Sequence, residues 1–403
     1  MSLKTRYSEK IRLDERHLEL SRIQFGSHSD ATYLNTGSVG HKPLSVLEAI
    51  ERGWRHLNTN PTLTTYLESE HIETCRQAAA DLFEVNSECL FFADSTTQGL
   101  QLLISSFLRY AGDEVVTTSR EHKSVNTILR YLEDTRGIKV RRLTVDNDLS
   151  SEQLCMSILN VISPDTRLIL ISEIDCHTGW RPDLTILTES LKLLEMPLLV
   201  DGAHAPGNGP CRPGRYPLWV GAGHKWLGGP NGTAFVYAER DLIPRLDPLI
   251  YGDGFYQLRE EDLYDPRRLE CRGTADVVKL MGLKAAVELY AGLDQMLISD
   301  YQNYLVSYLK ESLLSRLPAR MRGPSMGLPE GEGQASMITF YFEPDFLKVK
   351  DLRQALWDEH RIWVQPDFLG VNPGAGVRIS GHYSLSESDI DRFVEALSGY
   401  VVD

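Results

Sequence analysis

The sequence predicts an α/β protein with a mostly parallel sheet flanked by helices, followed by a smaller α+β unit. Short apolar, β-rich segments alternate with segments of helical periodicity through about the first 240 residues, which is the βαβ rhythm of a parallel sheet. After Asp276 longer helical stretches replace this alternation. A chain of 403 residues is long enough for two or three domains. We expect an N-terminal arm over residues 1–32, a large domain over 33–285 and a small α+β domain over 286–403.

In the first part of the chain, the expected strands and helices alternate. The strands are expected at residues 89–93, 114–118, 140–145, 166–172, 197–200 and 232–237, and the helices at 99–110, 124–135 and 184–194. Residues 166–172 are apolar on both faces, as a strand buried inside a parallel sheet requires.

In the last part, helix formers fill residues 277–317 with a break near Gly292, and residues 323–333 are rich in glycine and proline, which predicts a loop. Further strands are expected at residues 336–342, 362–364 and 377–380, and further helices at 349–359 and from Glu387 onward.

The composition narrows the classes of partner. Asp and Glu outnumber Lys and Arg by 56 to 42, which argues against nucleic acid or an anionic membrane as the main partner. We find no secretory signal at the N-terminus and no apolar run near the roughly 18 residues of a membrane helix. The six cysteines are scattered without a Cys-x-x-Cys motif, so we expect no metal site, no disulfide framework and a cytoplasmic location.

The most informative residues are Asp201 and Lys225. Asp201 ends the apolar run of residues 196–200 (MPLLV), and Lys225 lies in residues 223–230 (GHKWLGGP). A lysine that forms a Schiff base with pyridoxal 5'-phosphate (PLP), together with an acid partner for the pyridinium nitrogen, explains this combination. The lysine must then have a lowered pKa, because only the neutral amine is a nucleophile. Taken alone, Lys225 could be a surface lysine and Asp201 a turn or cap residue.

Polar residues that follow other strands add an anion site and an aromatic ring. Ser95, Thr96 and Thr97 open a helix, where hydroxyl and backbone N–H groups can bind the cofactor phosphate. The alternative is an ordinary helix cap. His122 follows the strand that ends at Thr118 and could stack on the pyridine ring, although a lone histidine is more often structural.

Three further residues complete the candidate site. Arg378 could bind a substrate carboxylate as a bidentate fork, or belong to a surface ion pair. His204, three residues after Asp201, could bind the ring hydroxyl or the substrate, or be structural. Thr274, in residues 272–274 (RGT), could reach a phosphate of a neighbouring subunit or belong to a plain turn.

Together these motifs resemble the class V aminotransferase family of fold-type I PLP enzymes, and within it the isopenicillin N epimerase-like branch. The resemblance runs from about Tyr33 to Phe393 and rests on the segments 33–40 (YLNTGSVG), 201–206 (DGAHAP), 224–227 (HKWL), 270–276 (ECRGTAD) and 377–380 (VRIS). It implies a seven-stranded sheet in a large PLP-binding domain and a homodimer with its active site at the interface.

The resemblance also implies roles for individual residues. Lys225 matches the Schiff-base lysine, Asp201 the pyridinium partner and His122 the stacking histidine. His204 matches a position near the ring hydroxyl, and Arg378 matches the arginine that binds the substrate carboxylate. The other implied positions are Thr96, Thr97 and His224 at the phosphate, Thr274 from the second subunit, and Asn35 and Ser38 near the substrate.

The chain departs from the family pattern at three places. Glu173 replaces a histidine, and Cys176 stands where relatives have a residue that contacts the cofactor. Cysteine desulfurases carry a nucleophilic cysteine shortly before the arginine, whereas residues 362–378 contain none. Persulfide chemistry by that route is therefore not expected.

These observations predict an enzyme that acts at the Cα of an amino acid through a Lys225 Schiff base and a quinonoid carbanion. We favour a lyase (β-elimination with C–S cleavage) or an epimerase in specialised metabolism, with an aminotransferase or a decarboxylating deaminase as the alternative. A non-catalytic scaffold is a further hypothesis, which Asp201, Lys225 and Arg378 oppose. A nucleotide-binding enzyme is not supported, because no Gly-x-Gly-x-x-Gly opens the first βα unit.

Overall fold

The computed structural model describes most of the chain. The described residues are 23–25, 31–66, 70–146, 148–252, 259–270, 273–317, 321–322, 333–342, 344–366 and 376–402. The expected arm at residues 1–32 and the expected loop at 323–333 lie almost entirely outside these ranges.

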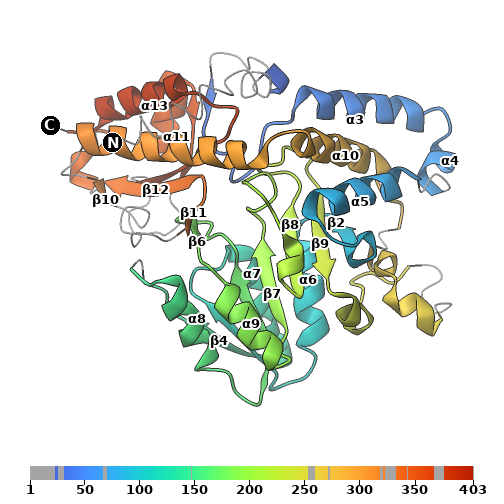
Figure 1. The fold of residues 1–403 in the computed structure, drawn as a ribbon. Coiled ribbons are helices and arrows are strands. Elements are labelled where there is room, and N and C mark those ends of the chain that lie inside the picture. Colours follow the sequence, from blue (N-terminus) through green and yellow to red (C-terminus); the bar gives the residue numbers. More distant parts are fainter. Residues whose placement is uncertain are drawn as a thin grey trace.

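A seven-stranded sheet forms the larger part of the fold (Figure 1), which confirms the predicted α/β class. Its order is β2-β9-β8-β7-β5-β3-β4, and only β9 runs antiparallel to its neighbours. The strands are β2 (Leu90–Ala93), β3 (Glu114–Thr118), β4 (Lys139–Leu143), β5 (Thr166–Ser172), β7 (Leu198–Gly202), β8 (Leu218–Ala222) and β9 (Ala234–Ala238). Strand β8 has no counterpart among the expected strands.

Helices cover both faces of this sheet, and the central strands are therefore buried along their whole length. The helices of this part are α3 (Leu44–Leu57), α4 (Pro61–Tyr66), α5 (Glu70–Phe83), α6 (Thr96–Phe107), α7 (Lys123–Arg136), α8 (Ser151–Leu159), α9 (Thr185–Leu193) and α10 (Val277–Ala291). Helix α6 lies very close to the sheet at Gly99, where a Cβ atom would come within 2.9 Å of the side chains of Val220 and Val236.

A second sheet of order β10-β12-β15-β14 belongs to the C-terminal part, at one side of Figure 1. Its strands are β10 (Met321–Arg322), β12 (Met337–Phe342), β14 (Gln365–Pro366) and β15 (Gly376–Ser380), and its helices are α11 (Gln295–Arg316), α12 (Leu352–His360) and α13 (Glu387–Tyr400). The predicted break between the two long helices is at Gly292–Asp294.

Two short strand pairs join the N-terminal and C-terminal parts of the chain. Strand β1 (Thr32–Tyr33) pairs with β13 (Ile362–Trp363), and β6 (Trp180–Arg181) pairs with β11 (Gly333–Gln334). The expected strand at residues 362–364 therefore does not belong to the small sheet. The boundary placed between residues 285 and 286 lies inside helix α10, and the division into domains stays a prediction.

A buried ion pair ties helix α5 to the edge of the large sheet. The guanidinium of Arg76 donates to both carboxylate oxygens of Glu270, at 2.7 and 3.0 Å, and to the carbonyl of Leu90. Glu270 also accepts from the backbone N–H of Phe92. The Arg76 side chain is only 1% exposed, so its charge depends on these partners.

Replacing Arg76 by alanine leaves the Glu270 carboxylate without its cation in a largely buried place. We expect Arg76→Ala to lower the free energy of unfolding in urea by about 3–5 kcal/mol. Arg55→Ala is the matched control, because Arg55 pairs with Glu51 on the exposed face of α3 and should cost at most about 0.5 kcal/mol. Equal small losses in both variants would contradict the structural role of the Arg76 pair.

Among the described residues, no helix is both long enough and apolar enough to cross a membrane.

Candidate active site

A cavity of about 710 Å³ lies at the carboxyl ends of β3, β5 and β7, beside the N-terminus of α6 and strand β15. Ligands bind at this edge in open parallel sheets. The predicted site residues that line it are Ser38, Ser95, Thr96, Thr97, His122, Cys176, Asp201, His204, His224, Lys225 and Arg378. The predicted residues Asn35 and Thr274 do not line it.

Asp201 lies near the end of the central strand β7, next to Ser172 of β5. Its side chain is 5% exposed, and Oδ1 accepts a hydrogen bond from the backbone N–H of Ala203 at 3.0 Å. Burial raises the pKa of Asp201, and the positive charge of Lys225 opposes this rise. A cation or an N–H donor in the cavity would stabilise the charged carboxylate.

Lys225 follows β8 in a tight turn, and its amine points into the same cavity. The Nζ atom lies 3.1 Å from Nε2 of His204. Burial lowers the pKa of Lys225 to about 8, with Asp201 acting in the opposite direction. The N-terminal loop holds this turn closely, because Gly40 donates to the carbonyl of His224 and a Cβ at Gly40 would lie 2.0 Å from the Lys225 carbonyl. The lowered pKa provides the neutral amine that the sequence argument required.

The N-terminus of α6 faces the cavity with hydroxyl and backbone N–H groups. Ser95 caps the helix, since its Oγ accepts from the backbone N–H of Gln98 at 3.1 Å. Thr96 and Thr97 form the first turn beside it. His224 lies on the same cavity, and burial lowers its pKa to about 4. This end of the cavity suits a phosphate, because free N–H groups and the helix dipole favour an anion there.

His122 combines a structural and a cavity-lining position. It is the N-cap of α7, with Nδ1 accepting from the backbone N–H of Ser124 at 3.2 Å. The ring also lines the cavity, and burial lowers its pKa to about 4. The structural role is therefore present, and the ring lines the cavity where a cofactor could bind, while stacking on the pyridine ring stays a prediction.

Arg378 of β15 is a buried cation whose hydrogen-bond partners are neutral. Its Nη1 donates to the carbonyl of Cys176 at 2.7 Å, and its Nη2 donates to the hydroxyl of Ser38 at 3.0 Å. The side chain is 6% exposed, and Nε has no partner among the described residues. Burial lowers the pKa of Arg378, so an anion bound beside it would relieve an unfavourable desolvation.

A small polar network supports Ser38 beside this guanidinium. The Ser38 hydroxyl lies 2.8 Å from both Asn35 Oδ1 and Gln365 Oε1, and Asn35 donates to Gln365 at 3.0 Å. Asn35 is therefore behind Ser38 and not at the cavity surface. Thr274 is exposed and lies outside the cavity, and its assignment to a second subunit stays a prediction.

Several cavity-lining residues were not predicted from the sequence, and two of them, Gln365 and Glu121, bear on the chemistry of the site. Gln365 comes from β14 of the small sheet. Glu121 is 2% exposed and accepts hydrogen bonds from Thr118 at 2.7 Å and Ser172 at 2.6 Å. Burial, with the nearby negative charge of Asp201, raises the pKa of Glu121 to about 8. Its position directly before His122, just after a strand, was the available signal.

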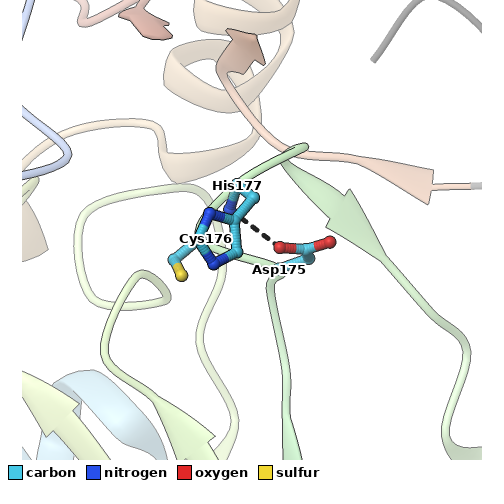
Figure 2. A group of neighbouring side chains, drawn as sticks. All are labelled: Asp175, Cys176 and His177. Carbon is cyan, nitrogen blue, oxygen red and sulfur yellow. Dashed lines mark hydrogen bonds between the residues drawn. The ribbon is translucent and has the colours of Figure 1, made fainter. Parts of the chain in front are cut away.

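Asp175, Cys176 and His177 bring possible metal-ligand atoms within 4.8 Å of one another (Figure 2). The carboxylate of Asp175 already accepts from the backbone N–H of His177, from Thr178 Oγ1 and from Arg120 Nη1, at 2.7, 2.9 and 3.2 Å. Burial raises the pKa of the Cys176 thiol to about 12. These groups shape the turn after β5, and the expectation of no metal stays a prediction.

The described residues fit PLP as a cofactor. The α6 N-terminus offers an anion site, the Lys225 amine lies beside the cavity, and the Asp201 carboxylate lies buried at its floor. Arg378, with a buried Nε that lacks a partner, offers a place for a second anion such as a substrate carboxylate. The fold and this constellation together define the class: a fold-type I PLP enzyme.

Comparison with known proteins specifies the family. Residues 32–393 match the class-V aminotransferase family, and the chain belongs to it. Members of this family are PLP-dependent enzymes.

Individual relatives match nearly the whole chain. The isopenicillin N epimerase of Amycolatopsis lactamdurans is 27% identical over 94% of this chain and 97% of its own length. A probable cysteine desulfurase of Ureaplasma parvum serovar 3 is 25% identical over 93% of this chain and 95% of its own length. The structure of the cystine C–S lyase C-DES with its product cysteine persulfide superposes with a TM-score of 0.78 at 23% identity, covering 94% of this chain and 100% of the other. This last similarity concerns the fold.

The pKa of Lys225 predicts how PLP uptake by the PLP-free protein depends on pH. Only the neutral amine reacts with an aldehyde, so the uptake rate should rise with pH through a midpoint near 8. His122 and His224, with pKa values of about 4, do not titrate in this range. Glu121 does, because burial raises its pKa to about 8, so Glu121→Gln serves as the control and should keep the midpoint. Stopped-flow absorbance after mixing with PLP measures the rate. A midpoint near 10.5, the ordinary value for lysine, would contradict the buried environment of Lys225.

Proposed function

We propose that this protein is a PLP-dependent lyase or epimerase that acts at the Cα of an amino acid carrying a free α-carboxylate. The observation that carries the proposal is the convergence of Asp201, Lys225 and Arg378 on one cavity from three separate elements. Bound PLP supplies an electron-withdrawing ring that stabilises negative charge at the Cα of an attached amino acid.

The protein residues have separate tasks around this chemistry. Asp201 would hold the ring nitrogen of PLP, and its carboxylate would favour the protonated form of that nitrogen. Arg378 binds the substrate carboxylate through its guanidinium, whose present partners, Ser38 and the Cys176 carbonyl, carry no charge. Lys225, whose amine is mainly neutral above about pH 8, takes the proton from Cα. The cavity is walled by buried strand ends, which strengthens each of these interactions.

Within this pair of activities, the histidine geometry favours the lyase. The Nδ1 atom of His122 accepts from the Ser124 amide, so the proton of the neutral ring is on Nε2. A ring in this form cannot accept a proton at Nε2. Lys225 is then the base beside the substrate. Inversion at Cα by two bases would need a second one on the opposite face, and His122 is poorly suited to that role. Epimerisation remains the second candidate because of the isopenicillin N epimerase relative.

The cysteine pattern supports direct release of a sulfur product. Residues 362–378 contain no cysteine. Of the five described cysteines, Cys75, Cys89, Cys155 and Cys211 are buried away from the cavity, and only Cys176 lines it. Burial raises the pKa of the Cys176 thiol to about 12, which disfavours the thiolate that would receive sulfur. In the proposed β-elimination the Cα–H and Cβ–S bonds break, the sulfur leaves as a thiol or persulfide, and water converts the remaining 2-aminoacrylate to pyruvate and ammonium.

We also propose a homodimer, in which Thr274 reaches the phosphate of the second subunit. Thr274 is exposed and far enough from the cavity of its own chain not to line it, which is compatible with such a role. The cytoplasmic location stays a prediction from composition.

A panel of amino acids that includes S-substituted cysteines, assayed in D₂O, tests the proposal. We expect pyruvate and ammonium in equal amounts from at least one member. Lys225→Ala should reduce the rate by about 10²–10⁴-fold through loss of the base, whereas Lys192→Ala, on the outer helix α9, should leave it unchanged. An inverted amino acid with deuterium at Cα would indicate epimerisation. Release of neither product, with no deuterium at Cα, would overturn both candidates.

A further inference from the structure

Three side chains form a hydrogen-bonded chain that ends on the amine of Lys225. The indole Nε1 of Trp226 lies 3.2 Å from Nδ1 of His204, and Nε2 of His204 lies 3.1 Å from Nζ of Lys225. Trp226 and His204 are 0% and 3% exposed. The hydrogen bond between Trp226 and His204 is therefore away from bulk solvent, where a polar group must find a protein partner. Lys225 is half-buried and lines the cavity.

The donor inventory leaves one arrangement of protons. An indole N–H can only donate, so Nδ1 of His204 accepts and carries no proton. If an ammonium of Lys225 donated to Nε2, both ring nitrogens would lack a proton and the ring would be an imidazolate anion. The neutral ring instead carries its proton on Nε2 and donates it to Nζ. Nζ can accept only through the lone pair of a neutral amine.

We propose that Trp226 is a positioning residue: its indole N–H fixes His204 as the Nε2–H tautomer, and this tautomer selects the neutral form of Lys225. The inference concerns the protein's own residues and does not depend on which reaction follows.

The surroundings hold each member of the chain in place. His382, two residues beyond β15, faces the carbonyl of Trp226 through its Nε2 at 3.1 Å, and its ring lies 6.3 Å from the indole ring. His204 itself stays neutral, because burial lowers its pKa well below the usual value. A neutral ring has only two tautomers, and Trp226 permits one of them.

Other charged or titratable groups also face Lys225, and the substitutions proposed below do not alter them. They come from β7, β15, the turns after β3 and β5, and the turn after β8, and they are Asp201, Arg378, His122, Cys176 and His224. Glu121, in the turn after β3, lines the same cavity. A difference between the wild type and a Trp226 variant therefore reports on the indole N–H and the ring that it orients.

The first test is the ¹⁵N spectrum of histidine-labelled, PLP-free wild-type protein at pH 9, above the pKa of Lys225, with the His204 signals assigned through His204→Gln. We expect a protonated Nε2 and an unprotonated Nδ1. The opposite tautomer, or an imidazolium with both nitrogens protonated, would overturn the proposal. This measurement decides the question even if a Trp226 variant fails to fold.

The second test compares Trp226→Phe with Trp219→Phe. Trp219 is the matched control: it is also fully buried, and its indole N–H donates elsewhere, to Glu173 at 3.0 Å. The readout is the pH midpoint of reductive methylation of Lys225 in PLP-free protein, followed by peptide mass spectrometry. We expect Trp226→Phe to raise the midpoint by about one unit, which is about tenfold less neutral amine at fixed pH. Trp219→Phe should leave it unchanged. Equal midpoints in wild type and Trp226→Phe would contradict the proposal.

Discussion

The structure depends on keeping charged side chains inside the protein at one edge of a buried sheet. Asp201, Lys225 and Arg378 all reach the same cavity, and burial shifts the pKa of each toward its neutral form. An uncompensated buried charge destabilises the folded protein, because the charge has lost its hydration. Such a cluster is therefore stable only where a ligand or a partner offsets the free energy of desolvation. A cofactor with a phosphate and a pyridinium nitrogen, and a substrate with a carboxylate, supply the complementary charges.

The need to hold these buried charged groups in fixed positions also explains the close packing of three parts of the fold. These parts are the N-terminal loop around Gly37 and Gly40, the small sheet and the large sheet. Gly37 donates its N–H to Ser380 of the small sheet, and Gly40 donates to the carbonyl of His224. A Cβ at Gly37 would come within 3.2 Å of the Arg378 guanidinium. The loop therefore packs between Arg378 and the turn that carries Lys225. Any shift of one sheet against the other would change the distance between these two side chains.

The central strands and the cluster of Asp201, Lys225 and Arg378 could be predicted from the sequence, because both have distinctive local sequence patterns. Strand β5 is a continuous apolar run, and Asp201 and Lys225 each follow apolar strands within recognisable segments. Strand β8 was missed because its five residues, Leu218–Ala222, include Gly221, which packs against Trp219 and interrupts the apolar pattern. Its burial comes from neighbouring strands and not from a local pattern.

Residues whose role depends on a distant partner were harder to predict. Gln365 contacts Asn35, which lies 330 positions away in the sequence. No sequence motif around a neutral amide predicts such a contact. Trp226 was recognised as part of a segment, but its bond to His204 requires the turn after β7 and the turn after β8 to meet. His122 both caps helix α7 and lines the cavity, and this combination could be recognised only from the structure.

The central claim is that Lys225, beside Asp201, is the residue that holds PLP. The most direct measurement is to incubate the protein with PLP, reduce it with sodium borohydride, digest it and locate the pyridoxyl group by mass spectrometry. The structure predicts a single modified peptide, with the group on Lys225, and loss of that modification in Lys225→Ala. Modification of a different lysine as the main product, or none at all, would contradict the account.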